Sequence, residues 1–148
     1  MIRQLDMTNP RFAESVLNIQ IPSYQAEAAL IDFYDIPPLK DTVKSLQQSG
    51  ETFFGYYINE ELSGVISMKI ENGVMDIHRL FVHPNHFRKG IAQKLLDFIQ
   101  TNAKEFETMI VSTGSKNAPA IHFYQKNGFM KIKDMLVDEG LSLTILKK

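Results

Sequence analysis

The stretch D-I-H-R-L-F-V-H-P-N-H-F-R-K-G-I-A-Q-K-L-L-D, residues 76–97, decides the fold because it reads as a strand, a short loop and a helix. The strand is predicted over residues 74–82, and Pro84 ends it because proline has no N–H to give to a ladder. The helix is predicted over residues 90–104. Its apolar side chains recur at helical spacing: Ile91, Leu95, Leu96 and Ile99.

The loop between this strand and this helix is basic, with Arg88, Lys89 and Gly90 in sequence. A helix N-terminus presents unpaired N–H groups and the positive end of the macrodipole. Gly90 lets the backbone approach an anion closely, and Ala92 keeps the first turn narrow. The loop therefore predicts a seat for a phosphate or a pyrophosphate.

Composition restricts the class of protein. The 148 residues suit one domain with a sizeable core, and 44% hydrophobic and 22% charged residues are typical of soluble globular proteins. A net charge of −1 gives no global field to recruit nucleic acid or an acidic membrane. No apolar run approaches the roughly 18 residues of a membrane span, and the first residues lack the plan of a secretory signal. The absence of cysteine excludes disulfides, thiolate metal sites and a cysteine nucleophile, and a cytoplasmic location is expected.

Alternation and turn signals divide the rest of the chain. Further strands are predicted over residues 1–7, 52–58, 62–71, 109–113, 129–137 and 141–146. Further helices are predicted over residues 12–20, 24–32, 41–48 and 117–126. Pro22 lies in the break predicted between the first two of these helices. Residues 36–39, which contain Pro37 and Pro38, are predicted to form an extended loop.

The order of these elements indicates the fold class. Asn72-Gly73 is a strong hairpin signal, so the strands on either side of it are expected in an antiparallel meander. A helix between the strands 74–82 and 109–113 suggests a parallel crossover. We therefore expect an α/β fold (an α+β mixed sheet) in one domain, residues 1–148. Its central sheet has about seven strands, mostly antiparallel with one parallel step, and about four helices flank it.

The basic loop and its surroundings resemble the signature of the GNAT superfamily, the acyl-CoA-dependent N-acetyltransferases. In that family a strand ends in valine, a proline follows, and Gln/Arg-x-x-Gly-x-Gly/Ala opens a helix. Here the pattern falls on Val82, Pro84 and residues 87–92. Phe87 departs from it, which weakens a side-chain contact to a pyrophosphate but leaves the backbone contacts intact.

A second stretch, N-A-P-A-I-H-F-Y-Q-K-N-G-F at residues 117–129, resembles the C-terminal motif of the same family, Asn-x-x-Ala-x-x-Phe-Tyr-x-x-x-Gly-Phe. The positions in register are Asn117, Ala120, Phe123, Tyr124, Gly128 and Phe129. Two independent stretches are more specific than either alone. With the strand order, the resemblance extends over roughly residues 52–137 and implies a GNAT-like sheet.

The resemblance implies acetyl-CoA as cosubstrate and a set of residues that bind it. The pyrophosphate would lie against Phe87, Arg88, Lys89, Gly90, Ile91 and Ala92. The backbone of Leu80, Phe81 and Val82 would pair with the pantetheine arm like an added strand, and the Val82 N–H would polarise the thioester carbonyl. Asn117 and Phe123 complete the set, although Asn117 is equally well suited to capping its helix.

The resemblance also places Tyr124 as the acid that protonates the departing CoA thiolate; a core aromatic is the alternative. A phenol has a reference pKa of about 10 and a thiol of about 8.5, so the transfer is slightly uphill unless the site tunes it. The amine needs a base, because an alkylammonium with a reference pKa of about 10.4 is almost entirely protonated at neutral pH and must lose a proton before it attacks. The candidates are Asp76 and His78, with surface polar residues as the alternative. A regular strand puts both on one face with Leu80 and Val82, and a bulge would change that facing.

Other polar and aromatic residues give weaker signals. The spacing of His83, His86 and His122 matches no metal-binding pattern, so no metal is expected. Four residues in or just after the second predicted helix could line an acceptor pocket or pack as core: Tyr24, Glu27, Phe33 and Tyr34.

The leading hypothesis is an N-acetyltransferase that moves an acetyl group from acetyl-CoA to a primary amine. The amine attacks directly, with no covalent enzyme intermediate. The alternatives are a CoA-binding sensor or interaction module without turnover, and an unrelated phosphate-binding enzyme, although the chain lacks a Walker motif and a G-x-G-x-x-G. The acceptor is expected to be a small-molecule or peptide amine, and the sequence does not identify it further. Neither nucleic acid nor a membrane is expected as a partner, and a homodimer is left open because dimers are common in the family.

Overall fold

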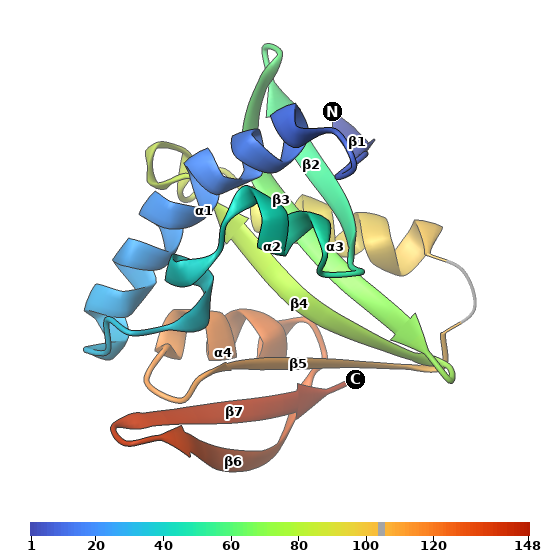
Figure 1. Ribbon diagram of the computed structural model, residues 1–148. Coiled ribbons are helices and arrows are strands. Elements are labelled where there is room, and N and C mark those ends of the chain that lie inside the picture. The colour runs from blue at the N-terminus through green and yellow to red at the C-terminus, as the bar shows by residue number, and fades with distance from the viewer. Residues whose placement is uncertain (104–105) are drawn as a thin grey trace.

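The computed structural model describes residues 1–103 and 106–148 (Figure 1). The last residue of the helix predicted over residues 90–104, Lys104, lies outside the described residues. In chain order the elements are β1 (Ile2–Leu5), α1 (Pro10–Ile31), η1 (Pro37–Lys40), α2 (Val43–Gln47), β2 (Thr52–Ile58), β3 (Glu61–Glu71), β4 (Val74–Val82), η2 (Pro84–His86), α3 (Ile91–Asn102), β5 (Thr108–Gly114), α4 (Ala118–Lys126), β6 (Met130–Asp138) and β7 (Leu141–Lys147).

The strands form one seven-stranded sheet in the order β1-β2-β3-β4-β5-β7-β6. Among its pairs, β4 and β5 run parallel and the others run antiparallel. The turn between β3 and β4 has positive φ at both Asn72 and Gly73, the conformation that this dipeptide tolerates best. The predicted mixed sheet with one parallel step and flanking helices is confirmed.

Helices cover both faces of the sheet (Figure 1). On one face α1 and α2 bury an apolar cluster that includes Val16, Leu46 and Phe53. On the other face α3 and α4 cover a larger cluster, whose members include Leu95 and Tyr124. Both clusters exclude apolar side chains from water, and this burial holds the two layers of helices against the sheet.

Helix α1 is continuous, so the prediction of two helices separated at Pro22 was wrong. A proline in a helix removes one backbone hydrogen bond and costs about 3 kcal/mol relative to alanine. The buried stripe continues on both sides of it, with Val16 and Ile19 before the proline and Ala28 and Ile31 after it. Burial of this stripe against the sheet outweighs the local loss.

The prediction of an extended loop at residues 36–39 was also wrong. Ile36 is extended, as a residue before proline should be, but residues 37–40 form the short helix η1. The Leu39 N–H donates to the Ile36 carbonyl at 3.1 Å. The fixed φ of proline suits a 3₁₀ turn as well as an extended chain. The other predicted elements occur with bounds that differ by at most two residues, and the strands predicted over residues 52–58 and 74–82 have these same bounds.

The parallel pair is short, and this positions the site. Residues Val74 to Ile77 of β4 pair with residues Thr108 to Val111 of β5, while β5 continues to Gly114 paired with β7 along its other edge. Figure 1 shows β4 and β5 together at one end and diverging toward the C-terminal end of β4. The sheet therefore opens between two neighbouring strands.

Candidate functional site

Strand β4 contains a bulge at His78. Ile77 lies opposite Met68, and Arg79 lies opposite Ser67, so His78 is the extra residue of β4. Before the bulge, the side chain of Ile77 faces the cluster under α3 and α4.

After the bulge, Leu80 and Val82 face that same cluster, whereas Phe81 faces α1. The strand is therefore not regular, and the bulge changes the facing of Asp76, His78, Leu80 and Val82 as a bulge was expected to do. Asp76 and His78 lie on the face of α1, whereas Leu80 and Val82 lie on the opposite face, because the extra residue reverses the alternation that follows it.

The backbone of β4 beyond the bulge faces the open gap. The His83 N–H donates to the Ser63 carbonyl of β3 at 2.9 Å, and Val82 lies opposite Gly64. Bonded and non-bonded pairs alternate along an antiparallel ladder. The N–H and C=O groups of Val82 and Leu80 therefore point away from β3, toward the side where β5 has diverged.

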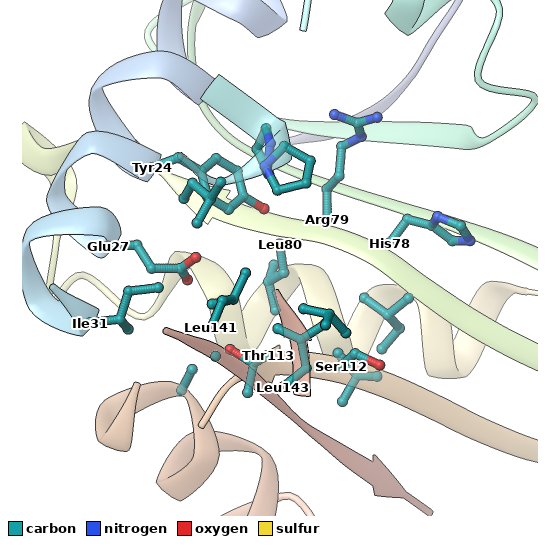
Figure 2. Close-up of a pocket in the computed structure, with 18 of the residues that line it drawn as sticks. Tyr24, Glu27, Ile31, His78, Arg79, Leu80, Ser112, Thr113, Leu141 and Leu143 are labelled. Carbon is teal, nitrogen blue, oxygen red and sulfur yellow. The ribbon is translucent and has the colours of Figure 1, made fainter. Parts of the chain in front are cut away.

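A cavity of about 370 Å³ lies between α1, β4, β5, α4 and the β6–β7 hairpin. Much of its wall is apolar, formed by aliphatic and proline side chains such as Ile31, Pro37 and Leu143. In Figure 2, Tyr24 and Glu27 reach from α1, and Leu141 reaches from β7, toward the same space. Of the candidate catalytic residues, His78 and Tyr124 line the cavity.

Tyr124 is 5% exposed, and its ring packs edge-on against Phe123 and Phe129 at centroid distances of 5.2 and 5.3 Å. Burial raises the pKa of the Tyr124 phenol, and the nearby Glu27 carboxylate raises it further. The phenol therefore keeps its proton at neutral pH and can act as an acid but not as a base. Its proton is held more tightly than in a free tyrosine.

Glu27 is tied to the start of α4. The Asn117 Nδ2 donates to Glu27 Oε1 at 2.7 Å, while the Asn117 Oδ1 accepts from the Ala120 N–H at 3.2 Å and caps the helix. Burial raises the pKa of the Glu27 carboxyl, and the hydrogen bond from Asn117 lowers it by less. The capping role foreseen for Asn117 is confirmed, with Glu27 as an additional partner.

His78 lies between two carboxylates. Its Nε2 is 3.5 Å from Asp76 Oδ2, and its Nδ1 is 3.7 Å from Glu51 Oε2. Burial raises the pKa of the Asp76 carboxyl, and proximity to His78 lowers it by less. The two base candidates are therefore adjacent, although only His78 lines the cavity.

An ion-pair network next to His78 was not foreseen from the sequence. The Arg79 Nε donates to Glu51 Oε1 at 2.9 Å, its Nη1 donates to Asp41 Oδ2 and to Gln20 Oε1, and Ser67 Oγ donates to Glu51 Oε1 at 2.6 Å. Two consecutive polar residues, His78 and Arg79, within an apolar strand were the signal for both the bulge and a paired arginine.

We expect this network to make the protein sensitive to acid. Burial alone would raise the pKa values of Glu51 and Asp41, but the hydrogen bonds from Arg79 outweigh it and hold both pKa values below their ordinary 4.5 and 3.8. A carboxyl with a lowered pKa stabilises the fold above its unfolded pKa and loses that contribution as the pH falls through its folded pKa. The melting temperature should therefore fall below about pH 4. Between pH 7 and pH 3 the melting temperature of Glu51→Gln should fall less than that of the wild type, and an equal fall would contradict this account.

The basic loop lies where β4 ends and the gap is widest. Gly90 precedes α3 with φ of +74°, no side chain caps the helix, and a Cβ at Gly90 would meet no atom within 4 Å. Arg88 also has a positive φ, +63°, and Phe87 is 48% exposed. The uncapped N–H groups and the open space in front of them fit an anion.

α3 lies close to the sheet at this point. A Cβ at Gly64 of β3 would lie 2.7 Å from Ile91 Cγ2, so only glycine leaves room for the first turn of the helix. Ile91 is buried, and Ala92 packs against the same cluster. The start of α3 is thus fixed by packing rather than by a side-chain cap.

Leu80 lines the cavity, whereas Phe81, Phe123 and Asn117 do not. Phe81 is buried beside the Tyr24 ring, Phe123 packs against the cluster under α4, and Asn117 caps α4. Of the four residues considered for an acceptor pocket, Tyr24 and Glu27 line the cavity, whereas Phe33 packs against a smaller apolar cluster.

In the part of the chain that the structure describes, residues 1–103 and 106–148, no group of three or more histidine, aspartate or glutamate side chains is arranged to hold a metal ion. No helix in it is long and apolar enough to cross a membrane.

This chain is similar to known proteins over most of its length. Residues 13–129 match the family described as the Acetyltransferase (GNAT) family. The chain is 39% identical over 145 residues to the UPF0157 protein YqkA of Bacillus subtilis (strain 168), a match that covers 98% of this chain and 42% of that protein. The chain thus spans less than half the length of this curated relative.

Solved structures share the fold. An acetyltransferase from Thermus thermophilus superposes with a TM-score of 0.80 at 21% identity, covering 100% of this chain and 96% of that one. The PaiA N-acetyltransferase from Thermoplasma acidophilum, in complex with coenzyme A, gives a TM-score of 0.75 at 21% identity, covering 100% and 98%.

Proposed function

This chain belongs to the acetyltransferase (GNAT) family, and we propose that it transfers an acetyl group from acetyl-CoA to a primary amine. The observation that carries the proposal is the opening between β4 and β5, which places free backbone groups of β4 beside a cavity that contains Tyr124. Solved relatives of this fold include a complex with coenzyme A. In this proposal residues 1–148 act as one GNAT domain.

The residues present fit such a cosubstrate. The uncapped start of α3, with Gly90 and the cations Arg88 and Lys89, suits a pyrophosphate. The outward N–H and C=O groups of Leu80 and Val82 suit an extended amide-containing arm, which would pair with β4 in the place that β5 leaves. Acetyl-CoA, when bound, supplies a thioester-activated acetyl group.

The chain's own groups would then direct the transfer. The Val82 N–H donates to the thioester carbonyl oxygen. His78 takes up the proton of the acceptor ammonium, directly or through water, while Asp76 and Glu51 orient its ring. Tyr124 Oη gives its proton to the leaving sulfur. Because the acceptor amine attacks directly, no side-chain nucleophile is required.

The proposal is tested by melting the protein with and without acetyl-CoA, with ATP as the control anion. At about 100 times the Kd, binding should add about 2.7 kcal/mol to the free energy of unfolding. For a domain of this size the melting temperature should rise by roughly 5–10 °C. ATP should give no comparable shift, and thiol release with a panel of amines should follow.

A matched variant locates the binding site. Arg88→Asn with Lys89→Gln removes both charges, and asparagine tolerates the positive φ of residue 88. Without acetyl-CoA this variant should have the melting temperature of the wild type. At the same acetyl-CoA concentration its melting temperature should rise less than that of the wild type. A shift without thiol release to any amine would indicate a CoA-binding module without turnover, and no shift at millimolar acetyl-CoA would contradict the proposal.

A further inference from the structure

The cavity has an unequal distribution of charge. Glu27 is the carboxylate among its lining residues in the part of the chain that the structure describes, and Arg79 is the lining cation. The Arg79 guanidinium is held by Glu51, Asp41 and Gln20. Figure 2 shows this guanidinium directed away from the space that Glu27 and Leu141 face. His78 also lines the cavity, between the carboxylates of Asp76 and Glu51. A ligand beside Glu27 therefore meets a carboxylate without a free guanidinium or ammonium group.

Glu27 has capacity for a ligand. Its Oε1 accepts from Asn117, which fixes the orientation of the carboxylate, and Figure 2 shows the carboxylate turned toward the cavity. A carboxylate can accept several hydrogen bonds, so the bond from Asn117 leaves room for an ammonium. Charge-assisted hydrogen bonds of this kind are stronger than neutral ones, particularly where water is excluded.

The wall around Glu27 is apolar. Ile31 lies one turn further along α1, and Ile36, Leu141 and Leu143 face the same space from η1 and β7. Such a wall favours the hydrocarbon part of a ligand and offers no partner to a carboxylate. The volume of about 370 Å³ is within the range of small-molecule sites.

We propose that Glu27 is the specificity-determining residue for the acceptor, and that the acceptor is a compact amine with one ammonium group on an apolar body and no carboxylate beside it. This inference rests on the proposed function. The Glu27 carboxylate receives the ammonium, the apolar wall holds the carbon skeleton, and an amino acid is rejected because its carboxylate would face Glu27 without a cation.

The same contact connects binding to the chemistry. The Glu27 carboxylate is one of the groups that hold the Tyr124 proton in place. The positive charge that the acceptor nitrogen gains as it attacks offsets that charge, so the phenol releases its proton more readily when the acceptor reacts beside Glu27. Glu27 thus acts on the acid through the substrate.

The probes are three molecules of similar size: 3-methylbutylamine, leucinamide and leucine. Calorimetric titration into the protein saturated with CoA measures binding without turnover, and thiol release with acetyl-CoA measures kcat and KM. We expect 3-methylbutylamine and leucinamide to bind and leucine not to bind in the millimolar range. If leucinamide is rejected as strongly as leucine, the carboxylate is not the cause and the inference fails.

The variant is Glu27→Gln, which keeps an oxygen for Asn117 and removes the charge. Its kcat/KM for 3-methylbutylamine should fall about 10- to 30-fold, mainly through KM, with a matching loss in titration. The control is Glu14→Gln, the same change at an exposed position of α1. Since burial already disfavours the Glu27 charge, Glu27→Gln should melt no lower than the wild type.

The outcomes separate the two proposals. Transfer to leucine as efficient as to 3-methylbutylamine, or equal effects of Glu27→Gln and Glu14→Gln, overturns the role of Glu27 while leaving the acetyltransferase proposal standing. Preferential binding of 3-methylbutylamine that Glu27→Gln abolishes, without transfer from acetyl-CoA, supports the role of Glu27 and contradicts the acetyltransferase proposal. If no amine binds or reacts, the inference fails.

Discussion

Replacement of Tyr124 by phenylalanine is expected to lower kcat by a factor of about 10²–10⁴, the usual contribution of a general acid. The phenol lines the cavity beside the open edge of β4, and burial together with Glu27 keeps it protonated. The variant loses a single oxygen, and its ring retains the contacts with Phe123 and Phe129. Thiol release at saturating acetyl-CoA and amine measures the effect, and the melting shift with acetyl-CoA should be unchanged.

The cavity supplies a matched control. Tyr24 is a second phenol in its wall, and burial also raises the pKa of Tyr24, so Tyr24→Phe removes the same atom from a similar environment. Its kcat should stay close to that of the wild type. If Tyr24→Phe is the slower enzyme, or if Tyr124→Phe retains full activity, the leaving thiolate takes its proton from another group.

Replacement of Arg79 by methionine should lower the free energy of unfolding by about 3–5 kcal/mol, because it leaves buried carboxylates without their cation. The Glu51 side chain is 5% exposed, and the side chain of Asp41, the other carboxylate that pairs with Arg79, is 17% exposed. The melting temperature should fall by roughly 10 °C, measured by calorimetry at pH 7.

The control for this variant is Arg3→Met. Arg3 pairs with Glu60 at 3.2 Å, but the side chains are 41% and 82% exposed. Exposed pairs contribute little, since water screens them. A loss from Arg79→Met no larger than that from Arg3→Met would show that the network around Glu51 does not stabilise the fold.

The elements of the fold could be predicted because their signals are local. Asn72-Gly73 predicted its hairpin from the backbone that these two residues tolerate, and the stripe of Ile91 and Leu95 predicted α3 from its spacing. Pro22 led to the wrong prediction of a break in α1 for a related reason. Its cost is local and visible in the sequence, whereas the burial that outweighs it depends on the sheet on which α1 lies.

The candidate site was only partly predictable, because its contacts join distant parts of the chain. Glu27 and Asn117 are 90 residues apart, and Arg79 pairs with Glu51 and Asp41, which precede it by 28 and 38 residues. The bulge at His78 depends on the pairing register with β3, which the composition of β4 alone does not determine. The motifs therefore predicted where a cosubstrate would lie better than what surrounds the acceptor.

The short parallel pair between β4 and β5 has a mechanical consequence. Strands β1 to β4 form one plate, and β5, β7 and β6 form another, with four residue pairs joining them, from Val74–Thr108 to Ile77–Val111. An extended ligand bound beyond these four pairs would hydrogen-bond to β4 in one plate while packing against the other plate, and so would connect the two. We therefore expect the sheet to bend most easily along this short pairing of β4 and β5, and an extended ligand to stiffen it there.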